Sequence, residues 1–251
     1  MRGTRLVLVG SAFIAACSSV TSTPDAGNTL DATTADASEA SVTADAGGDA
    51  SIADATADVV DAAALGCDGS YPVGPYGKNP GDVITNLGWT GKTDSNMNGF
   101  VSDDGYTTIC LASYFQNPNI QVVVLIGSAV WCVPCNEEVP DLVTLYQSYQ
   151  SDGGHVAFLE VLLDGTNVGI APTTTQFQSW TTKYKQPYDV VIGDQAHVLN
   201  DYNPQLAYPL QVVVQTSTMK IFTETVGNDV PGLQNAIDTA LGKPPQDAGT
   251  D

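Results

Sequence analysis

The sequence predicts an α/β domain in which a mixed β-sheet lies between two covering layers, a three-layer α/β/α sandwich preceded by a disordered linker. Two runs, 122–126 and 156–163, are apolar at successive positions, as in central strands of a sheet covered on both faces. Between them, Leu142, Leu145 and Tyr149 recur at helical spacing. Strands that alternate with helices in this way build the α/β class.

The first sixteen residues are typical of an export signal. A short basic start, Met1 to Arg5, precedes eleven apolar residues, which are fewer than the roughly 20 that span a bilayer. The stretch 14–17 (IAAC) resembles the lipobox of bacterial lipoprotein signals, which implies that Cys17 becomes the acylated first residue. We therefore expect a lipid anchor in the cell envelope, on the side facing the periplasm or the exterior. An ordinary cleaved signal is the alternative.

Residues 17–66 differ in composition from the rest of the chain. From 18 to 66 there are nine acids, no Lys or Arg and no aromatic residue. Such a segment cannot bury enough apolar surface to offset its ordering entropy, so we expect a disordered acidic tether. A filler of no selected length is equally compatible. The whole chain carries 28 acids against 8 bases, a formal charge of −20, which argues against nucleic-acid binding.

Residues 67–120 are expected to extend the fold at its N-terminal side. The segment 71–81 is rich in turn residues, and 83–89 is typical of a short strand. A polar, glycine-bearing loop is predicted over 94–105. The stretch 107–115 can begin as a strand and end as a short helix, and the sequence leaves this open.

Residues 121–243 hold the remaining elements. The helix that contains Leu142 is expected to end near Gly153, and Thr173 with Gln176 forms a capping box for a second helix through Tyr184. We then expect a strand at 188–192, a short helix at 196–202, a hairpin of 210–214 with 220–226, a helix at 231–241 and a polar tail at 244–251.

The strongest chemical signal is Trp131-Cys132-Val133-Pro134-Cys135, which stands where a buried strand passes into a helix. A cysteine at a helix N-terminus meets unpaired N–H groups and the positive end of the dipole, which stabilise its thiolate. The two-residue spacing lets the second cysteine close a disulfide with the first. A CxxC pair is also half of a zinc site, but the chain offers no second half. We expect no metal and no cofactor.

The segment 131–140 (WCVPCNEEVP) resembles the WCxPCxxExP motif of the thioredoxin superfamily, in particular its TlpA/ResA-like membrane-tethered thiol-disulfide oxidoreductases. The CxxxC of copper-delivery relatives and the PxxxTxxC of peroxidase relatives are absent. The resemblance implies a thioredoxin-like fold, with Cys132 as the nucleophile, Cys135 as the resolving thiol, Glu138 as the family's glutamate and Pro140 as a helix-kinking proline.

The same resemblance places Tyr208-Pro209 opposite the CxxC as a cis-proline, although a trans proline at the first residue of a strand is the alternative. There the Tyr208 backbone would pair with an extended substrate, beside Trp131.

One position departs from the thioredoxin pattern. Thioredoxin has a buried aspartate six residues before its first cysteine, and this chain has Ile126 there. The adjacent strand carries Glu160 in an otherwise apolar run. We hypothesise that Glu160, desolvated and with a raised pKa, or Glu138 accepts the proton of Cys135. A solvated position for Glu160 at the sheet edge is the alternative.

Cys67 and Cys110 are the two cysteines that remain. An exported chain favours their oxidation, so we expect a structural disulfide that closes a 44-residue segment. Two buried free thiols or a second redox pair are the alternatives.

Together these features predict an exported, lipid-anchored thiol-disulfide oxidoreductase. Pro134 resembles the CxPC type of reducing members, so reduction of protein disulfides is the expected direction. The expected partners are disulfide-containing protein substrates and a thiol electron donor. The alternative is a thioredoxin-fold binding module at the cell surface, in which the CxxC is a structural disulfide.

Overall fold

A computed structural model describes residue 67 and residues 69–193, 197–203 and 205–243. The predicted signal peptide, the lipidation site Cys17, the linker and the polar tail 244–251 lie outside the described residues. The described elements are β1 (Gly88–Lys92), β2 (Thr107–Cys110), the 3₁₀ helix η2 (Leu111–Ser113), β3 (Val122–Ala129), α1 (Val133–Ser151), β4 (Val156–Asp164), α2 (Thr174–Tyr184), β5 (Asp189–Ile192), the 3₁₀ helix η3 (Val198–Tyr202), β6 (Leu210–Gln215), β7 (Lys220–Val226) and α3 (Val230–Ala240).

The strands form one mixed sheet in the order β2-β1-β5-β4-β3-β6-β7. β3, β4 and β5 run parallel, and their crossovers carry α1 and α2. β6 is antiparallel to β3, and β7 is antiparallel to β6. All eight residues of β3 are buried, as expected for a strand paired on both edges and covered on both faces. The register places Ile126 of β3 beside Glu160 of β4.

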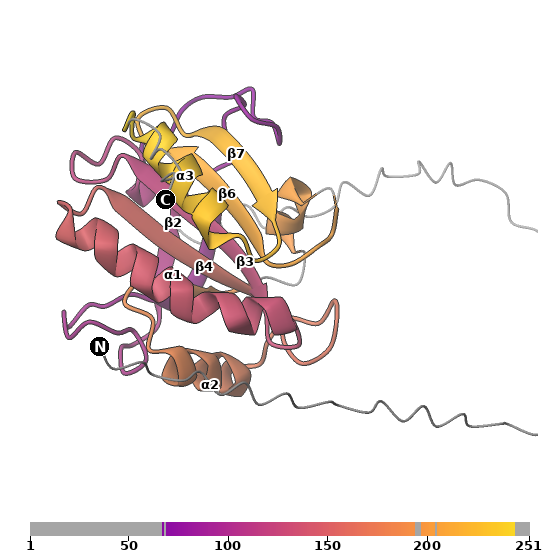
Figure 1. The fold of residues 1–251 in the computed structure, drawn as a ribbon. Helices are drawn as coiled ribbons and strands as arrows, with labels where there is room; N and C mark the ends of the chain where they lie inside the picture. The colour runs from indigo at the N-terminus through magenta and orange to yellow at the C-terminus, as the bar shows by residue number, and fades with distance from the viewer. Residues whose placement is uncertain (1–66, 68, 194–196, 204, 244–251) are drawn as a thin grey trace, which may run out of the picture. The chain divides into compact units, whose positions relative to one another are not determined.

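Two apolar clusters, one on each face of the sheet, form the core. α1, α2 and α3 pack on one face through side chains such as Leu142, Phe177 and Ile237, and Figure 1 shows these three helices on the same side of the strands. The other face is covered by the segment before β1 together with η2 and η3, through Ile84, Leu111 and others. The mixed sheet with a layer on each face is confirmed, and the second layer is made of short 3₁₀ helices and extended chain.

Most predicted elements lie within a residue or two of their expected bounds. The capping box forms in both directions, because Gln176 N donates to Thr173 Oγ1 and Thr173 N donates to Gln176 Oε1. The region 107–115, left open by the sequence, is a strand followed by a 3₁₀ helix.

The strand predicted at 83–89 was misplaced. The paired strand is β1, at Gly88–Lys92, whereas Val83 makes only isolated bridges to Tyr76 and Lys220. The cause is long-range: Gly91 passes so close to Val190 that a Cβ there would lie 2.3 Å from its carbonyl oxygen. A glycine is therefore needed at position 91, inside the strand.

Candidate active site

A disulfide joins Cys132 and Cys135 at the start of α1, with their Cα atoms 5.3 Å apart. Cys132 is the N-cap of the helix, and its Sγ accepts a hydrogen bond from the Cys135 amide at 3.1 Å. Pro134 occupies the first helical turn, where its missing N–H costs no hydrogen bond. In the reduced state, the same amide and the helix dipole would stabilise a thiolate at Cys132.

Both sulfur-bearing side chains are buried, with 2 % of Cys132 exposed and none of Cys135. The exposed positions beside them are Trp131 and Val133, which are 39 % and 65 % exposed. The exposed Trp131, Val133 and Pro134 thus surround the disulfide at the surface, and Cys132 is the more exposed of the two cysteines.

Pro140 lies inside α1 and leaves the carbonyl of Asn136 without its helical donor. The hydroxyl of Tyr184, on α2, lies 3.2 Å from that carbonyl oxygen and 2.5 Å from Asn136 Oδ1. Asn136 in turn donates through Nδ2 to the carbonyl of Cys132 at 2.7 Å. Because Pro140 leaves the Asn136 carbonyl free, Asn136 can contact both the active-site turn and Tyr184 of α2.

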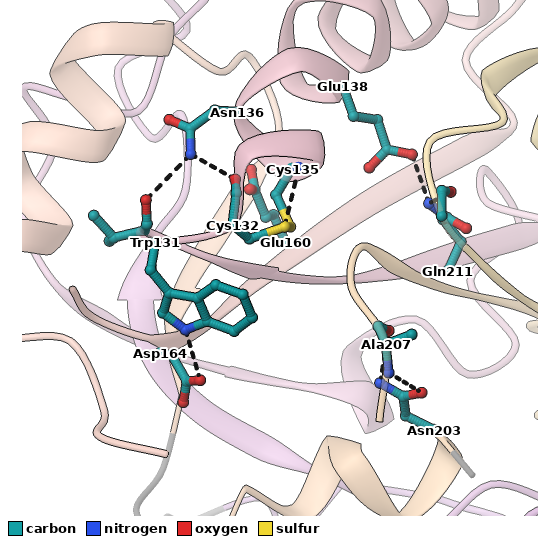
Figure 2. The surroundings of a disulfide bond; sticks show 12 residues. Trp131, Cys132, Cys135, Asn136, Glu138, Glu160, Asp164, Asn203, Ala207 and Gln211 are labelled. Atoms are coloured by element: carbon teal, nitrogen blue, oxygen red, sulfur yellow. Dashed lines mark hydrogen bonds between the residues drawn. A yellow bond between two sulfur atoms is a disulfide. The ribbon is translucent and has the colours of Figure 1, made fainter. Parts of the chain in front are cut away.

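The Trp131 ring is held by a buried carboxylate that the sequence reasoning missed (Figure 2). Trp131 Nε1 donates to Asp164 Oδ2 at 3.0 Å, and the Gly169 amide donates to the same oxygen at 3.0 Å. Asp164 Oδ1 lies 3.0 Å from His197 Nε2. The signal available in the sequence was Asp164 itself, an acid that ends an apolar strand.

The loop that faces the cysteines contains Tyr208-Pro209, whose peptide bond is cis. The Tyr208 ring meets the Trp131 ring edge to face, with centroids 6.0 Å apart. Tyr208 Oη donates to Asn200 Oδ1 at 2.6 Å, and Asn203 closes the loop by exchanging two hydrogen bonds with the Ala207 backbone. The structure therefore brings Trp131 and Tyr208 together at one edge of the site.

Glu138 projects from the first turns of α1 and is fully buried. Its Oε1 accepts a hydrogen bond from Gln211 Nε2 at 2.5 Å, while Oε2 has no partner among the described residues. Burial raises the pKa of Glu138 to about 8, and the nearby charge of Glu160 adds to the rise against the opposing hydrogen bond from Gln211. The carboxyl is therefore mostly protonated at neutral pH.

Glu160 is also fully buried, so the solvated alternative is excluded. Its Oε1 accepts from Trp180 Nε1 at 3.1 Å, and its Oε2 accepts from Gln186 Nε2 at 3.0 Å. Burial raises the pKa of Glu160, and these hydrogen bonds oppose the rise without cancelling it. Figure 2 draws this carboxyl behind the Cys132–Cys135 turn.

The partners of the two carboxyls were not predicted. Gln211 stands inside the apolar strand β6, and Gln186 is a buried amide just before β5. A polar residue in an apolar run was the available signal, as it was for Glu160. The result is a pair of buried carboxyls in which the charge of Glu160 adds to the proton affinity of Glu138.

Cys67 and Cys110 form a second disulfide, with their Cα atoms 5.7 Å apart and a sequence separation of 43. The bond joins the segment before β1 to the end of β2 and excludes the alternative of two free thiols.

Among the described residues, no helix has the length and apolar character needed to cross a membrane.

Comparison with known proteins identifies the family of the chain. The model of the AhpC/TSA family matches residues 94–220, just over half of the sequence. None of the curated proteins matches significantly.

Solved structures that are similar include the reduced 2-Cys peroxiredoxin of Plasmodium vivax, with 12 % identity over 65 % of this chain and 96 % of that one, at a TM-score of 0.50. The secreted thiol-disulfide isomerase of Corynebacterium glutamicum is 15 % identical over 69 % of this chain and 98 % of that one, at a TM-score of 0.48. StoA of Bacillus subtilis is 17 % identical over 61 % of this chain and 98 % of that one, at a TM-score of 0.42. At these identities the likeness concerns the fold.

Proposed function

Since the chain belongs to the AhpC/TSA family and has a thioredoxin-like fold, we propose that it is a thiol-disulfide oxidoreductase that reduces protein disulfides through Cys132 and Cys135. The observation that carries the proposal is the joint placement of a CxxC pair at a helix N-terminus and two buried, protonatable carboxyls beneath it. A structural disulfide needs neither the helix terminus nor the acids.

The proposed reaction starts from the reduced pair. The Cys132 thiolate attacks one sulfur of a substrate disulfide, and the other sulfur leaves as a thiolate that takes up a proton. Cys135 then loses its proton and attacks Sγ of Cys132, which releases the second substrate thiolate. Two electrons have passed to the substrate, and the chain holds the Cys132–Cys135 disulfide. A thiol donor returns it to the dithiol by the reverse exchange.

Glu138 and Glu160 are the proposed proton carriers for Cys135. An efficient acceptor has a pKa close to that of the group it deprotonates, and a free cysteine thiol titrates at about 8.5. Burial brings the pKa of Glu138 to about 8 and raises that of Glu160. The ionised fraction of Glu138 can take the proton when Cys135 attacks, and the protonated carboxyl can return it when the disulfide is reduced. Burial shifts the pKa of Glu160 in the same direction.

Trp131 and Tyr208 are the proposed substrate-facing residues. Their rings touch at the edge of the site, and Tyr208 immediately precedes Pro209 and β6. An extended substrate segment could lie along the Tyr208 backbone, with its disulfide directed at Cys132.

The location proposed for this activity is the cell envelope. Cleavage after residue 16 and acylation of Cys17 would anchor the chain, and residues 17–66 would tether the domain formed by the extension 67–120 and the thioredoxin-like part 121–243. Several acyl chains hold a protein stably at a membrane. The two disulfides accord with an oxidising compartment.

Insulin reduction with dithiothreitol as donor tests the proposed activity. We expect the chain to accelerate precipitation of the insulin B chain and Cys132→Ser to abolish the effect. The double variant Cys67→Ala with Cys110→Ala is the control, because it also removes one disulfide but leaves the CxxC intact. A Cys132→Ser variant as active as the parent would exclude the proposal and favour a binding module with a structural CxxC.

A further inference from the structure

Asp164, at the end of β4, contacts three of the segments that frame the candidate active site. Its Oδ2 accepts hydrogen bonds from Trp131 Nε1 and from the Gly169 amide, both at 3.0 Å (Figure 2). Its other oxygen, Oδ1, lies 3.0 Å from Nε2 of His197, which stands between β5 and η3. The side chains of Asp164 and His197 are only 3 % and 14 % exposed. A mostly buried pair of acid and imidazole is therefore bonded to the proposed substrate-facing tryptophan.

His197 also leads to the second substrate-facing ring. It is the N-cap of η3, and its carbonyl accepts a hydrogen bond from the Asn200 amide at 2.7 Å. The Asn200 side chain accepts from Tyr208 Oη at 2.6 Å, and the Tyr208 ring meets the Trp131 ring with centroids 6.0 Å apart. The contacts thus form a closed circuit, which runs from Trp131 through Asp164, His197 and Asn200 to Tyr208 and back.

The contact between Asp164 and His197 requires a proton on Nε2. Neither Asp164 Oδ1 nor His197 Nε2 has a hydrogen-bond partner elsewhere among the described residues. Without a hydrogen on Nε2, two electron pairs would face each other at 3.0 Å. An imidazolium always carries that hydrogen and adds a positive charge, whereas a neutral imidazole can place its single hydrogen on either nitrogen. Imidazoles change between these forms at about pH 5 to 8, so the contact depends on pH.

Few other ionisable groups surround this pair. The segments 127–136 and 165–173 contain no Asp, Glu, Lys, Arg or His. In the loop before β6, burial raises the pKa of Tyr208 and the charge of Asp164 adds to the rise, so Tyr208 stays neutral. On η3, Asp201 is paired with Lys78 at 2.8 Å, and both side chains are more than half exposed. Within this described part of the chain, His197 is thus the group that can change the charge beside Asp164 around neutral pH.

We propose that His197 is a positioning residue that makes the placement of Trp131 and Tyr208, and with it the binding of disulfide substrates, dependent on pH. Protonated His197 holds Asp164 by an ion pair, and Asp164 holds the Trp131 ring. When His197 loses its charge, Asp164 Oδ1 keeps at most a neutral hydrogen bond, which is weaker, so both rings are held less firmly. The effect on substrates rests on the proposed function, whereas the coupling itself exists in the oxidised chain without a substrate.

The effect of pH on substrate binding has the opposite sign to its effect on thiol chemistry. The two rings are held most firmly at low pH, so KM for a peptide disulfide should rise as pH increases. We expect a rise of about fivefold between pH 5.5 and pH 8, the factor that one hydrogen bond typically contributes. Exchange itself becomes faster as pH increases, because more thiolate forms. The positioning effect is therefore seen in KM and the thiol chemistry in kcat.

The first test follows the full oxidised chain in ¹H–¹⁵N spectra from pH 5 to pH 8.5. The Trp131 indole N–H and the Gly169 amide are the reporters, because both donate to Asp164 Oδ2. Trp131→Phe identifies the indole signal among those of the three tryptophans. We expect both reporters to shift along one curve, with a common midpoint between about pH 5 and pH 8. The cysteines are joined in disulfides in this state and do not titrate.

The two histidines of the chain provide the variant and its matched control. His197→Gln keeps an amide that can donate to Asp164 but never carries a charge, so it should abolish the common transition. His155→Gln removes the other histidine, which is exposed and precedes β4 at the opposite end of the strand from Asp164, and it should leave the transition intact. A transition that persists in His197→Gln belongs to another group, such as Glu138, and would overturn the proposal.

The test remains decisive if His197→Gln does not fold. His197→Asn then replaces it, because asparagine also adopts the positive φ of 50° found at this position. The spectra of the parent are sufficient for a refutation without any variant. If the Trp131 and Gly169 reporters do not move between pH 5 and pH 8, His197 does not act on Asp164.

The second test measures KM and kcat at pH 5.5 and pH 8 for a disulfide-bridged peptide and for hydroxyethyl disulfide, which is too small to contact both rings. For the peptide, the parent should show the rise in KM of about fivefold, and His197→Gln should show one KM at both pH values. A His197→Gln variant with the parent's pH-dependent KM would exclude the role in substrate binding. If the parent reduces neither substrate, the proposed function fails and with it the effect on substrates, whereas the spectra still decide the coupling of His197 to Asp164.

Discussion

Replacing Glu138 by Gln should make the stability of the oxidised fold less sensitive to alkaline pH. Glu138 has a pKa of about 8 in the fold against 4.5 for an exposed glutamate, because it is buried and lies near Glu160. The folded chain therefore holds a proton that the unfolded chain releases, so stability falls as pH rises from about 4.5 to about 8. Glutamine keeps the volume and can still accept from Gln211, but it has no charge to bury.

The magnitude follows from the two pKa values. At 1.36 kcal/mol per pKa unit, ionising Glu138 inside the fold costs about 5 kcal/mol, of which about 4 kcal/mol develops between pH 5 and pH 9. Urea unfolding of the oxidised chain at pH 5, 7 and 9 measures this difference. We expect Glu138→Gln to match the parent at pH 5 and to exceed it at pH 9 by about 4 kcal/mol.

Glu137→Gln is the control, since it removes the adjacent carboxylate, which is exposed. It should leave the pH dependence unchanged. If the unfolding free energies of Glu138→Gln and of the parent run parallel from pH 5 to pH 9, Glu138 is not held protonated by burial, and the proposed proton carrier loses its basis.

Three further outcomes are expected. Cys67→Ala with Cys110→Ala should lower the unfolding free energy by about 4 kcal/mol in urea, the loop entropy of about 44 residues, and a loss below about 1 kcal/mol would exclude a stabilising role. Glu160→Gln should slow resolution of a mixed disulfide at pH 7 by about 100-fold and shift its pH profile, measured by quenched-flow alkylation, whereas an unmoved profile would refute its part in proton transfer. Cys17→Ser should move the chain from the membrane fraction to the soluble fraction and remove the acyl mass, whereas unchanged mass and fractionation would exclude the lipid anchor.

The part of the fold that could be predicted from sequence is the part that local patterns determine. β3 and β4 are mostly apolar because both faces of the sheet are covered, and the capping box of α2 needs only two residues three apart. The CxxC at the start of α1 follows from the strand-to-helix transition. The match to the AhpC/TSA family and the observed fold confirm the thioredoxin-superfamily resemblance that this motif indicated.

The part that could not be predicted depends on contacts between distant segments. β1 pairs with β5 a hundred residues later, and the close approach at Gly91 is invisible in the local sequence. The same limit applied to the site. Glu160 was noticed as an acid in an apolar run, but its burial depends on Trp180 and Gln186, which reach it from other segments.

A redox titration of the Cys132–Cys135 pair against glutathione buffers, with the thiols trapped by alkylation, tests most directly whether this disulfide cycles. We expect a midpoint potential above about −300 mV, at which protein thiols and disulfides exchange with the pair, together with reduction of insulin. A midpoint potential far below about −300 mV with no insulin reduction would show that the disulfide is structural, and the chain would then be a thioredoxin-fold binding module.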